Sequence, residues 1–192
     1  MRATSELLNV PTRGRTARFA AARRAFTLIE ILMVVVILGI LSAVILPQLG
    51  SRDDQKAISG ARVLVADIMY AQNRAIATQK THYVSFDKVA NKYQVLDAWP
   101  ATIIKHPVNG GPYVVQFGNV SGSTVKDASI ASAAFDAKPV LAFDAMGVPH
   151  SYDAGTGTLT ALSAGDVVVR SGTYDMTVSV APFSGEVSLK SP

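Results

Sequence analysis

Apolar residues dominate one long run near the N-terminus of the chain. The run extends over Phe26–Leu49, and no residue from Ile31 to Gly50 carries a charge. As an α-helix, Phe26–Leu49 would be about 36 Å long at a rise of about 1.5 Å per residue. That length is sufficient to cross a bilayer core of about 30 Å. The pattern therefore predicts a transmembrane helix within residues 26–50.

The next segment, residues 51–81, alternates apolar and polar residues with helical spacing. Asp53 and Asp54 suit the start of a helix because its N-terminus carries partial positive charge. Pro47 is expected to kink or loosen the chain between the two helical segments. Apolar residues at this spacing predict one buried stripe, made of Ala57, Ile58, Ala61, Leu64, Val65, Ile68, Ala71, Ala75 and Ile76.

The remaining residues, 82–192, are rich in Val, Thr, Ser, Gly and Tyr. Short runs of these residues separated by Gly and Pro turn signals predict β-strands. One helical segment followed by many short strands predicts an α+β fold, with a long N-terminal α-helix packed on an antiparallel β-rich head. Residues 97–139 show the weakest pattern and are predicted to be a loop region. The predicted strands are His82–Phe86, Tyr93–Leu96, Tyr113–Phe117, Val140–Phe143, Leu159–Leu162, Val167–Arg170, Tyr174–Ala181 and Glu186–Lys190.

Charge divides the chain at the start of the apolar run. Residues 1–25 contain six arginines and one acid, whereas the rest of the chain has 12 basic and 13 acidic residues. The net charge of +4 therefore comes from the N-terminal segment, and it does not indicate a basic head that binds nucleic acid. Arginines on only this side of the apolar run predict that the N-terminus stays in the cytoplasm.

A secretory signal peptide is the alternative interpretation of a basic segment followed by an apolar run. Such a peptide has a shorter apolar region, and a cleavage site with small residues follows it. Here Pro47-Gln48-Leu49 follows the run, and the small residue Ala25 precedes it. Cleavage before the run would remove 1–25 as a leader and keep the helix as a membrane anchor.

The residues around Ala25 carry a specific resemblance. The stretch Arg23-Arg24-Ala25-Phe26-Thr27-Leu28-Ile29-Glu30 resembles the processing site of type IV prepilins and of type II secretion pseudopilins. That family usually has Gly before the cut, where this chain has Ala25. The resemblance implies that a prepilin peptidase cleaves between Ala25 and Phe26 and N-methylates Phe26, while Arg23 and Arg24 hold the leader in the cytoplasm.

Glu30 is the one acidic residue within the apolar run. A carboxylate in a membrane helix is costly and usually has a partner. The resemblance implies that Glu30 pairs with the free amine of Phe26 on a neighbouring subunit, which would set the register of a filament. The alternative is that Glu30 lies at the level of the lipid headgroups.

Two later segments are similar to the GspH/FimT family of minor pilins: the helical stretch Ala61–Ala77, and the C-terminal stretches Phe143–Pro149 and Val178–Lys190. The similarity implies a pilin-like fold. It also implies a minor pseudopilin of a type II secretion system, most like its H component. Its partners would be a prepilin peptidase, other pseudopilins or pilins, and the inner-membrane assembly platform. The chain would cross the bacterial inner membrane once, with a cytoplasmic leader and a periplasmic head, before it joins a filament.

The alternative function is that of a minor pilin of a type IV pilus, which serves initiation, adhesion or DNA uptake. Some FimT-like proteins bind DNA through arginines in a turn near the C-terminus. In this chain Glu186 lies in that turn, and only Arg170 and Lys190 supply positive charge nearby. Because affinity for phosphates rises with the number of cations, nucleic-acid binding is not expected.

No catalytic, cofactor or metal site is predicted. The three histidines, His82, His106 and His150, lie far apart, and none has the spacing of a metal-binding motif. The chain contains no cysteine, which excludes disulfides and thiolate metal sites. An enzyme is therefore not expected.

Overall fold

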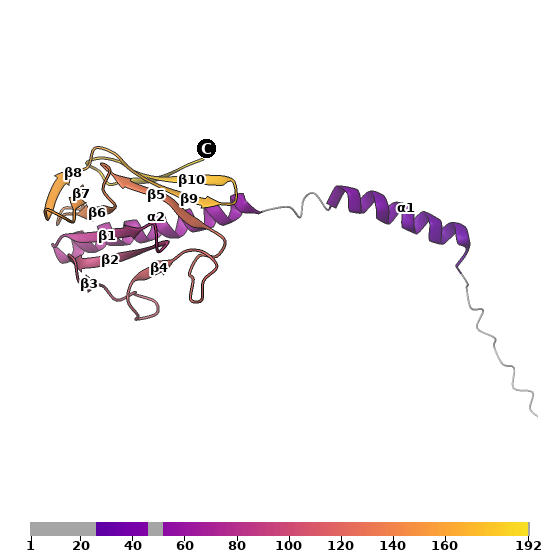
Figure 1. Cartoon of the computed structure of the whole chain (residues 1–192), viewed down its shortest axis with the longest axis horizontal. Coiled ribbons are helices and arrows are strands. Elements are labelled where there is room, and N and C mark those ends of the chain that lie inside the picture. Colours follow the sequence, from indigo (N-terminus) through magenta and orange to yellow (C-terminus); the bar gives the residue numbers. More distant parts are fainter. Residues whose placement is uncertain (1–25, 46–51, 192) are drawn as a thin grey trace, which may run out of the picture. The chain divides into compact units, whose positions relative to one another are not determined.

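The computed structural model describes residues 26–45 and 52–191 of the chain (Figure 1). These residues belong to two compact units, which are described separately. The first contains the helix α1 (Leu28–Ile45). The second, called the head below, begins with the helix α2 (Asp53–Thr78). The predicted leader 1–25 and the predicted kink at Pro47 lie outside the described residues. Within the described ranges, no helix is both long enough and apolar enough to cross a membrane.

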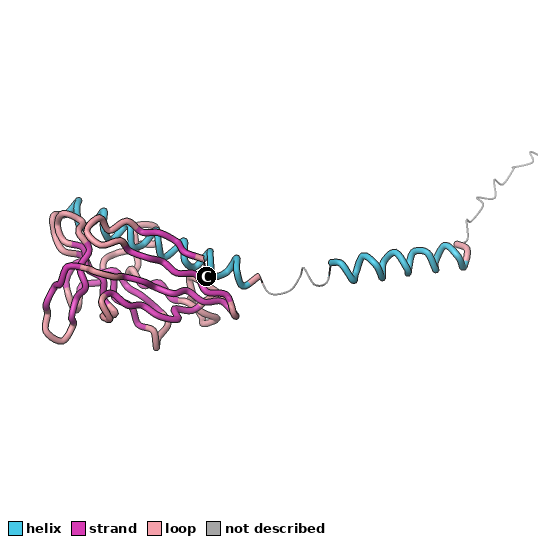
Figure 2. The backbone as a smooth tube through the Cα atoms, turned by 90° about the horizontal axis from the view of Figure 1, so that it is seen from above, coloured by secondary structure: helices cyan, strands magenta, loops and turns pink. Residues whose placement is uncertain are grey.

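The head is an α+β unit, as predicted, with α2 lying along strands of two antiparallel sheets (Figure 2). The first sheet has the order β3-β2-β1-β6-β7-β8, with β4 also paired to β2, and the second has the order β11-β10-β9-β5. The strands are β1 (His82–Asp87), β2 (Lys92–Ala98), β3 (Thr102–Ile103), β4 (Val114–Gln116), β5 (Ser129–Phe135), β6 (Val140–Phe143), β7 (Pro149–Asp153), β8 (Thr158–Ala161), β9 (Gly165–Ser171), β10 (Tyr174–Val180) and β11 (Val187–Lys190).

Helix α2 begins with Asp53 and Asp54 in its first turn, as the sequence predicted. It ends at Thr78, three residues before the predicted boundary. Gln79 adopts the left-handed conformation with φ of 54°, which stops the helix. The backbone N–H groups of Gln79 and Lys80 donate to carbonyls of the last turn, and thereby satisfy groups that a helix end leaves without partners.

The core of the head lies where α2 packs against strands of both sheets, chiefly β1, β9 and β10. The helix contributes most of its predicted stripe, but Ile58 and Val65 are only half-buried and Ile76 is exposed. The sheets contribute large aromatic side chains. Because the two sheets share this core, the head folds around one helix face. The fully buried members include Leu64, Ile68, Phe135, Leu141, Phe143, Val167 and Val178.

The prediction of a loop region over residues 97–139 was wrong in part. Besides β4, which was predicted as the strand Tyr113–Phe117, this segment contains β3 and β5, and β5 is a seven-residue strand paired to β9. The sequence of β5 is Ser-Ile-Ala-Ser-Ala-Ala-Phe, in which small residues with weak strand propensity outnumber β-branched ones. Its strand structure therefore depends on pairing with β9, whose paired residues lie 30 to 41 positions further along the sequence.

Candidate functional site

The predicted processing motif lies at the start of α1. Phe26 and Thr27 precede the helix, which begins at Leu28. The backbone N–H of Glu30 donates to Oγ1 of Thr27 at 3.3 Å, and the N–H of Ile31 donates to the carbonyl of Thr27 at 3.2 Å. Thr27 is therefore the N-cap of α1, and Glu30 is the third residue of the helix.

The structure thus gives Thr27 a role that our sequence prediction missed. The spacing of a threonine followed three residues later by a glutamate could have revealed it. Arg23, Arg24 and Ala25 lie outside the described residues. Phe26 is 72% exposed and lies before the first helical residue, so a cut before it would leave both α1 and its cap intact.

The surface of α1 is apolar, and the described residues of its own unit do not cover it. The large hydrophobic side chains in the range 28–41 are between 46% exposed (Val34) and 84% exposed (Leu28). A contiguous apolar surface of this kind marks a site of contact with lipid or with another protein. Glu30, in the first turn, is the only charged residue of this helix. The helix therefore combines an apolar surface on all sides with one carboxylate near its N-terminus.

A model of the prokaryotic N-terminal methylation motif matches residues 21–46. The match includes Ala25, Phe26 and Glu30 and the whole of α1. The chain is also 60% identical over 37 residues to the type II secretion system core protein G of Pseudomonas aeruginosa. The N-terminal segment of the chain therefore has the features of a type IV pilin-like protein. The alignment with protein G covers 19% of this chain and 26% of that relative, so the likeness is confined to a short segment.

Among solved structures, the type IV minor pilin FimU of Pseudomonas aeruginosa is similar to this pilin-like protein with a TM-score of 0.43 and 16% sequence identity. The similarity covers 72% of this chain and 94% of the FimU chain. Type IV pilin-like proteins are processed by a prepilin peptidase and assemble with other pilins or pseudopilins. Neither comparison distinguishes a secretion pseudopilin from a minor pilin of a pilus.

The head of this pilin-like protein contains a buried polar cluster that the sequence did not predict. Asp67 of α2 is 9% exposed and accepts hydrogen bonds from the hydroxyl groups of Tyr93 (2.5 Å) and Tyr113 (2.9 Å). Burial raises the pKa of Asp67, although the two tyrosine hydrogen bonds oppose the shift. Burial and the nearby carboxyl group of Asp67 raise the pKa of both tyrosines. The cluster joins α2 to β2 and to the residue that precedes β4.

A charged residue inside a buried helical stripe was the only sequence signal for this cluster. Asp67 follows Leu64 by three residues and therefore lies on the buried face of α2. The tyrosine partners could not be predicted, because Tyr93 and Tyr113 are 26 and 46 residues from Asp67 in the sequence. Their side chains meet only when β2 and β4 pair.

The C-terminal turn, where DNA-binding relatives would carry arginines, is held to α2. The side chain of Gln72 donates hydrogen bonds to the carbonyls of Gly147 and Ser184, both at 3.0 Å. Arg170, which we considered as a DNA contact, forms an ion pair with Asp175 in which Nε lies 2.6 Å from Oδ1. Its positive charge is therefore balanced within the same pair of strands. The absence of nucleic-acid binding stays a prediction.

Proposed function

We propose that this chain is a minor pseudopilin of a type II secretion system and that it acts by assembly, without catalytic activity. The observation that carries the proposal is the N-terminal unit itself. It combines the methylation motif at residues 21–46 with an apolar helix whose described side chains are exposed within its own unit. The similarity to a core protein of a type II secretion system supports the choice of system.

In this proposal a prepilin peptidase first cuts between Ala25 and Phe26. The apolar residues 26–50 then anchor the protein in the inner membrane, with the head in the periplasm. During assembly the same apolar surface leaves the lipid and packs against the corresponding helices of other subunits, so that it stays covered in both states. Glu30 would pair there with the amine of Phe26 on a neighbour, because a carboxylate in an apolar core needs a partner.

The processing step leads to a direct prediction. We expect the mature protein to begin with N-methyl-Phe26, because the motif places the cut before a residue that precedes α1. Mass spectrometry of the N-terminal peptide of the purified protein would test this. A peptide that still contains Arg24 and Ala25 would contradict it. A variant with Gly in place of Ala25, the residue typical of this motif, serves as the positive control for complete cleavage.

The choice of system can be tested in the organism that makes the protein. We expect a strain without this chain to retain its exported enzymes in the periplasm and to release them again on complementation. The measurement compares those enzymes in the culture supernatants of the deletion, parent and complemented strains. A complementing variant with Glu in place of Phe26 keeps the head but alters the processing site. Failure of this variant to restore export would show that processing, and not only the head, is required.

A minor pilin of a type IV pilus is the second candidate function. The processing motif Arg23–Glu30 favours it equally, because prepilins and pseudopilins share this motif. Unchanged export in the deletion strain would favour this candidate over the first. Counts of surface pili and of natural transformants in the same strains would then be the measurements that distinguish initiation from DNA uptake.

A further inference from the structure

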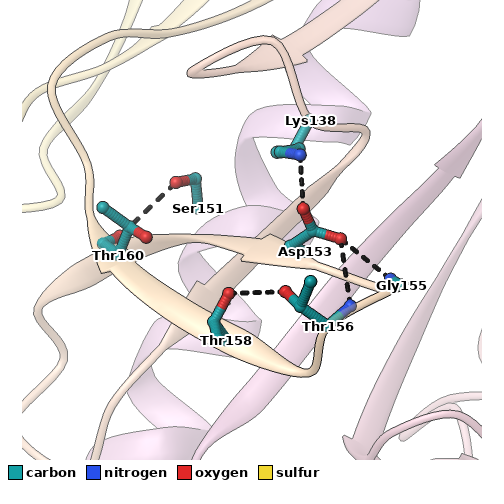
Figure 3. A network of polar contacts seen from close by, with 7 residues as sticks. All are labelled: Lys138, Ser151, Asp153, Gly155, Thr156, Thr158 and Thr160. Atoms are coloured by element: carbon teal, nitrogen blue, oxygen red, sulfur yellow. Dashed lines mark hydrogen bonds and ion pairs between the residues drawn. The ribbon is translucent and has the colours of Figure 1, made fainter.

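Strand β8 (Thr158–Ala161) forms one edge of the seven-stranded sheet. All four of its residues, Thr-Leu-Thr-Ala, are exposed, and none is charged. Along the chain β8 follows β7 through a tight turn, and both strands appear in close-up in Figure 3. The edge strand of a sheet presents unpaired backbone groups that can pair with another strand.

The register of the hairpin shows which residues present those groups. Pro149 accepts a hydrogen bond from Leu162, and Asp153 accepts one from Gly157. In an antiparallel ladder the bonded pairs alternate with non-bonded pairs. Leu159 and Ala161, which lie opposite Tyr152 and His150, are therefore in non-bonded pairs. Their N–H and C=O groups point away from β7.

The other edge strands among the described residues carry features that discourage pairing. Strand β3 has only two residues and follows Pro100, and β4 has only three residues, the last of which already accepts hydrogen bonds from the N–H groups of Thr124 and Val125. Strand β5 has a register irregularity between Ile130 and Ser132, and β11 carries Lys190. Short length, bulges, prolines and lysines are the usual protection of sheet edges. Strand β8 has no charge, proline or irregular pairing, and its length of four residues still leaves two residues with outward-facing groups.

Polar contacts at the turn between β7 and β8 also hold this hairpin in a fixed shape (Figure 3). Lys138 forms an ion pair with Asp153, whose other carboxylate oxygen accepts hydrogen bonds from the N–H groups of Gly155 and Thr156. The hydroxyl groups of Thr156 and Thr158 bond to each other at 2.7 Å. A strand that is already ordered loses less conformational entropy when it binds a partner.

We propose that β8 pairs with β8 of a second copy of this chain. One antiparallel register uses every outward-facing group: Leu159 opposite Ala161 of the partner, and Ala161 opposite Leu159 of the partner. This register gives four backbone hydrogen bonds and places the two-fold axis at Thr160. A shift of the register in either direction would pair one of these two residues with the turn or with the residues that follow β8, and would lose bonds.

The chemistry of the strand favours a second copy as the partner. In antiparallel pairing about a two-fold axis the residue at the axis lies opposite its own copy, so a charged residue at that position would repel itself. Strand β8 is uncharged, and its two Thr160 side chains can lie side by side at the axis. A two-fold contact of this kind closes on itself and joins only two subunits. This pairing of two copies goes beyond the proposed function and does not depend on it.

Cysteine cross-linking of the full chain in cell membranes tests the pairing, because the natural sequence contains no cysteine. In the proposed register the two Thr160 residues form a non-bonded pair with Cα atoms about 4.5 Å apart, which is suitable for a disulfide. We expect Thr160→Cys to give a disulfide-linked dimer of twice the chain mass when a mild oxidant accepts the two electrons. Mass spectrometry should find the peptide of residue 160 joined to its own copy.

Thr158→Cys is the matched control, since it lies on the same face of β8 two residues away. In the proposed register the two copies of residue 158 are offset by four residues, roughly 13 Å along the strands, which is too far for a disulfide. Equal dimer formation by both variants would overturn the proposed register. A cross-link from Thr160→Cys to a different protein, or no cross-link at all, would overturn the second copy as the partner.

A proline at position 161 tests the role of the backbone. The N–H of Ala161 faces away from β7, so Ala161→Pro removes no hydrogen bond of the hairpin and is tolerated at a sheet edge. It would remove two of the four bonds between the copies. In the background of Thr160→Cys we expect the cross-linking rate to fall roughly tenfold or more. An unchanged rate in a variant with an unchanged melting temperature would overturn the proposed pairing.

Discussion

A Glu30→Val variant is expected to insert into the membrane like the parent and to enter filaments roughly a hundredfold less. The substitution makes α1 wholly apolar, which favours insertion. In the filament, however, it would leave the amine of Phe26 buried without its counter-charge. Removal of one partner from a buried ion pair costs about 3–5 kcal/mol, and each 1.4 kcal/mol corresponds to about a tenfold change in an equilibrium constant.

The start of α1 should not change in this variant, because the bond from residue 30 to the N-cap Thr27 comes from the backbone N–H. Loss of assembly would therefore reflect the carboxylate and not the helix cap. Immunoblots of membrane and sheared-filament fractions measure the ratio of the two pools. Ile31→Val is the matched control, because it introduces the same residue at the next position and removes no charge. This variant should assemble normally. Normal assembly of Glu30→Val would instead support a position of Glu30 among the lipid headgroups.

Asp67→Ala is expected to lower the free energy of unfolding of the head by about 3 kcal/mol. The substitution leaves two hydroxyl groups without their acceptor, those of Tyr93 and Tyr113. Each buried polar group that loses its partner costs about 1–3 kcal/mol. The better helix propensity of alanine returns about 0.5 kcal/mol of this loss. Urea unfolding of the full chain in detergent, followed by circular dichroism, measures the difference.

Variants of the tyrosines separate the loss of hydrogen bonds from the loss of packing. Tyr93→Phe alone should cost about 1 kcal/mol, because Asp67 keeps the bond from Tyr113. In a triple variant that combines Asp67→Ala with Phe at both tyrosines, no hydroxyl group remains without an acceptor, so part of the stability should return. A triple variant less stable than Asp67→Ala would show that the cluster acts through packing alone.

The same cluster predicts a pH dependence of defined sign. Burial raises the pKa of Asp67 above its ordinary value of 3.8, so the folded state holds the proton more tightly than the unfolded state. The contribution of Asp67 to stability is therefore largest at low pH and decreases as the pH rises through its folded pKa. Asp67→Asn, which does not titrate, should lack this part of the pH dependence. The same urea unfolding measured between pH 4 and pH 7 provides the comparison.

The features of the N-terminal segment could be predicted from the sequence because their signals are local. The processing motif is a run of consecutive residues around Phe26, and an apolar run identifies a helix without knowledge of its neighbours. The buried stripe of α2 was predicted for the same reason, because the period of an α-helix relates residues three and four apart. The resemblance to type IV pilins followed from the processing motif. The α+β class of the head followed from the helical stripe together with the short strand-like runs after it.

The tertiary structure alone decided which distant residues meet. Strand β5 was missed because its small residues become a strand only by pairing with β9. The acceptor role of Asp67 depended on two tyrosines brought together by β2 and β4. Leu159–Leu162 was predicted as a strand, but only the order of the sheet shows that β8 is an edge. Local periodicity indicates which side chains of a helix or strand are buried. Sheet order and buried polar contacts cannot be predicted in this way, because they form between segments with no regular spacing in the sequence.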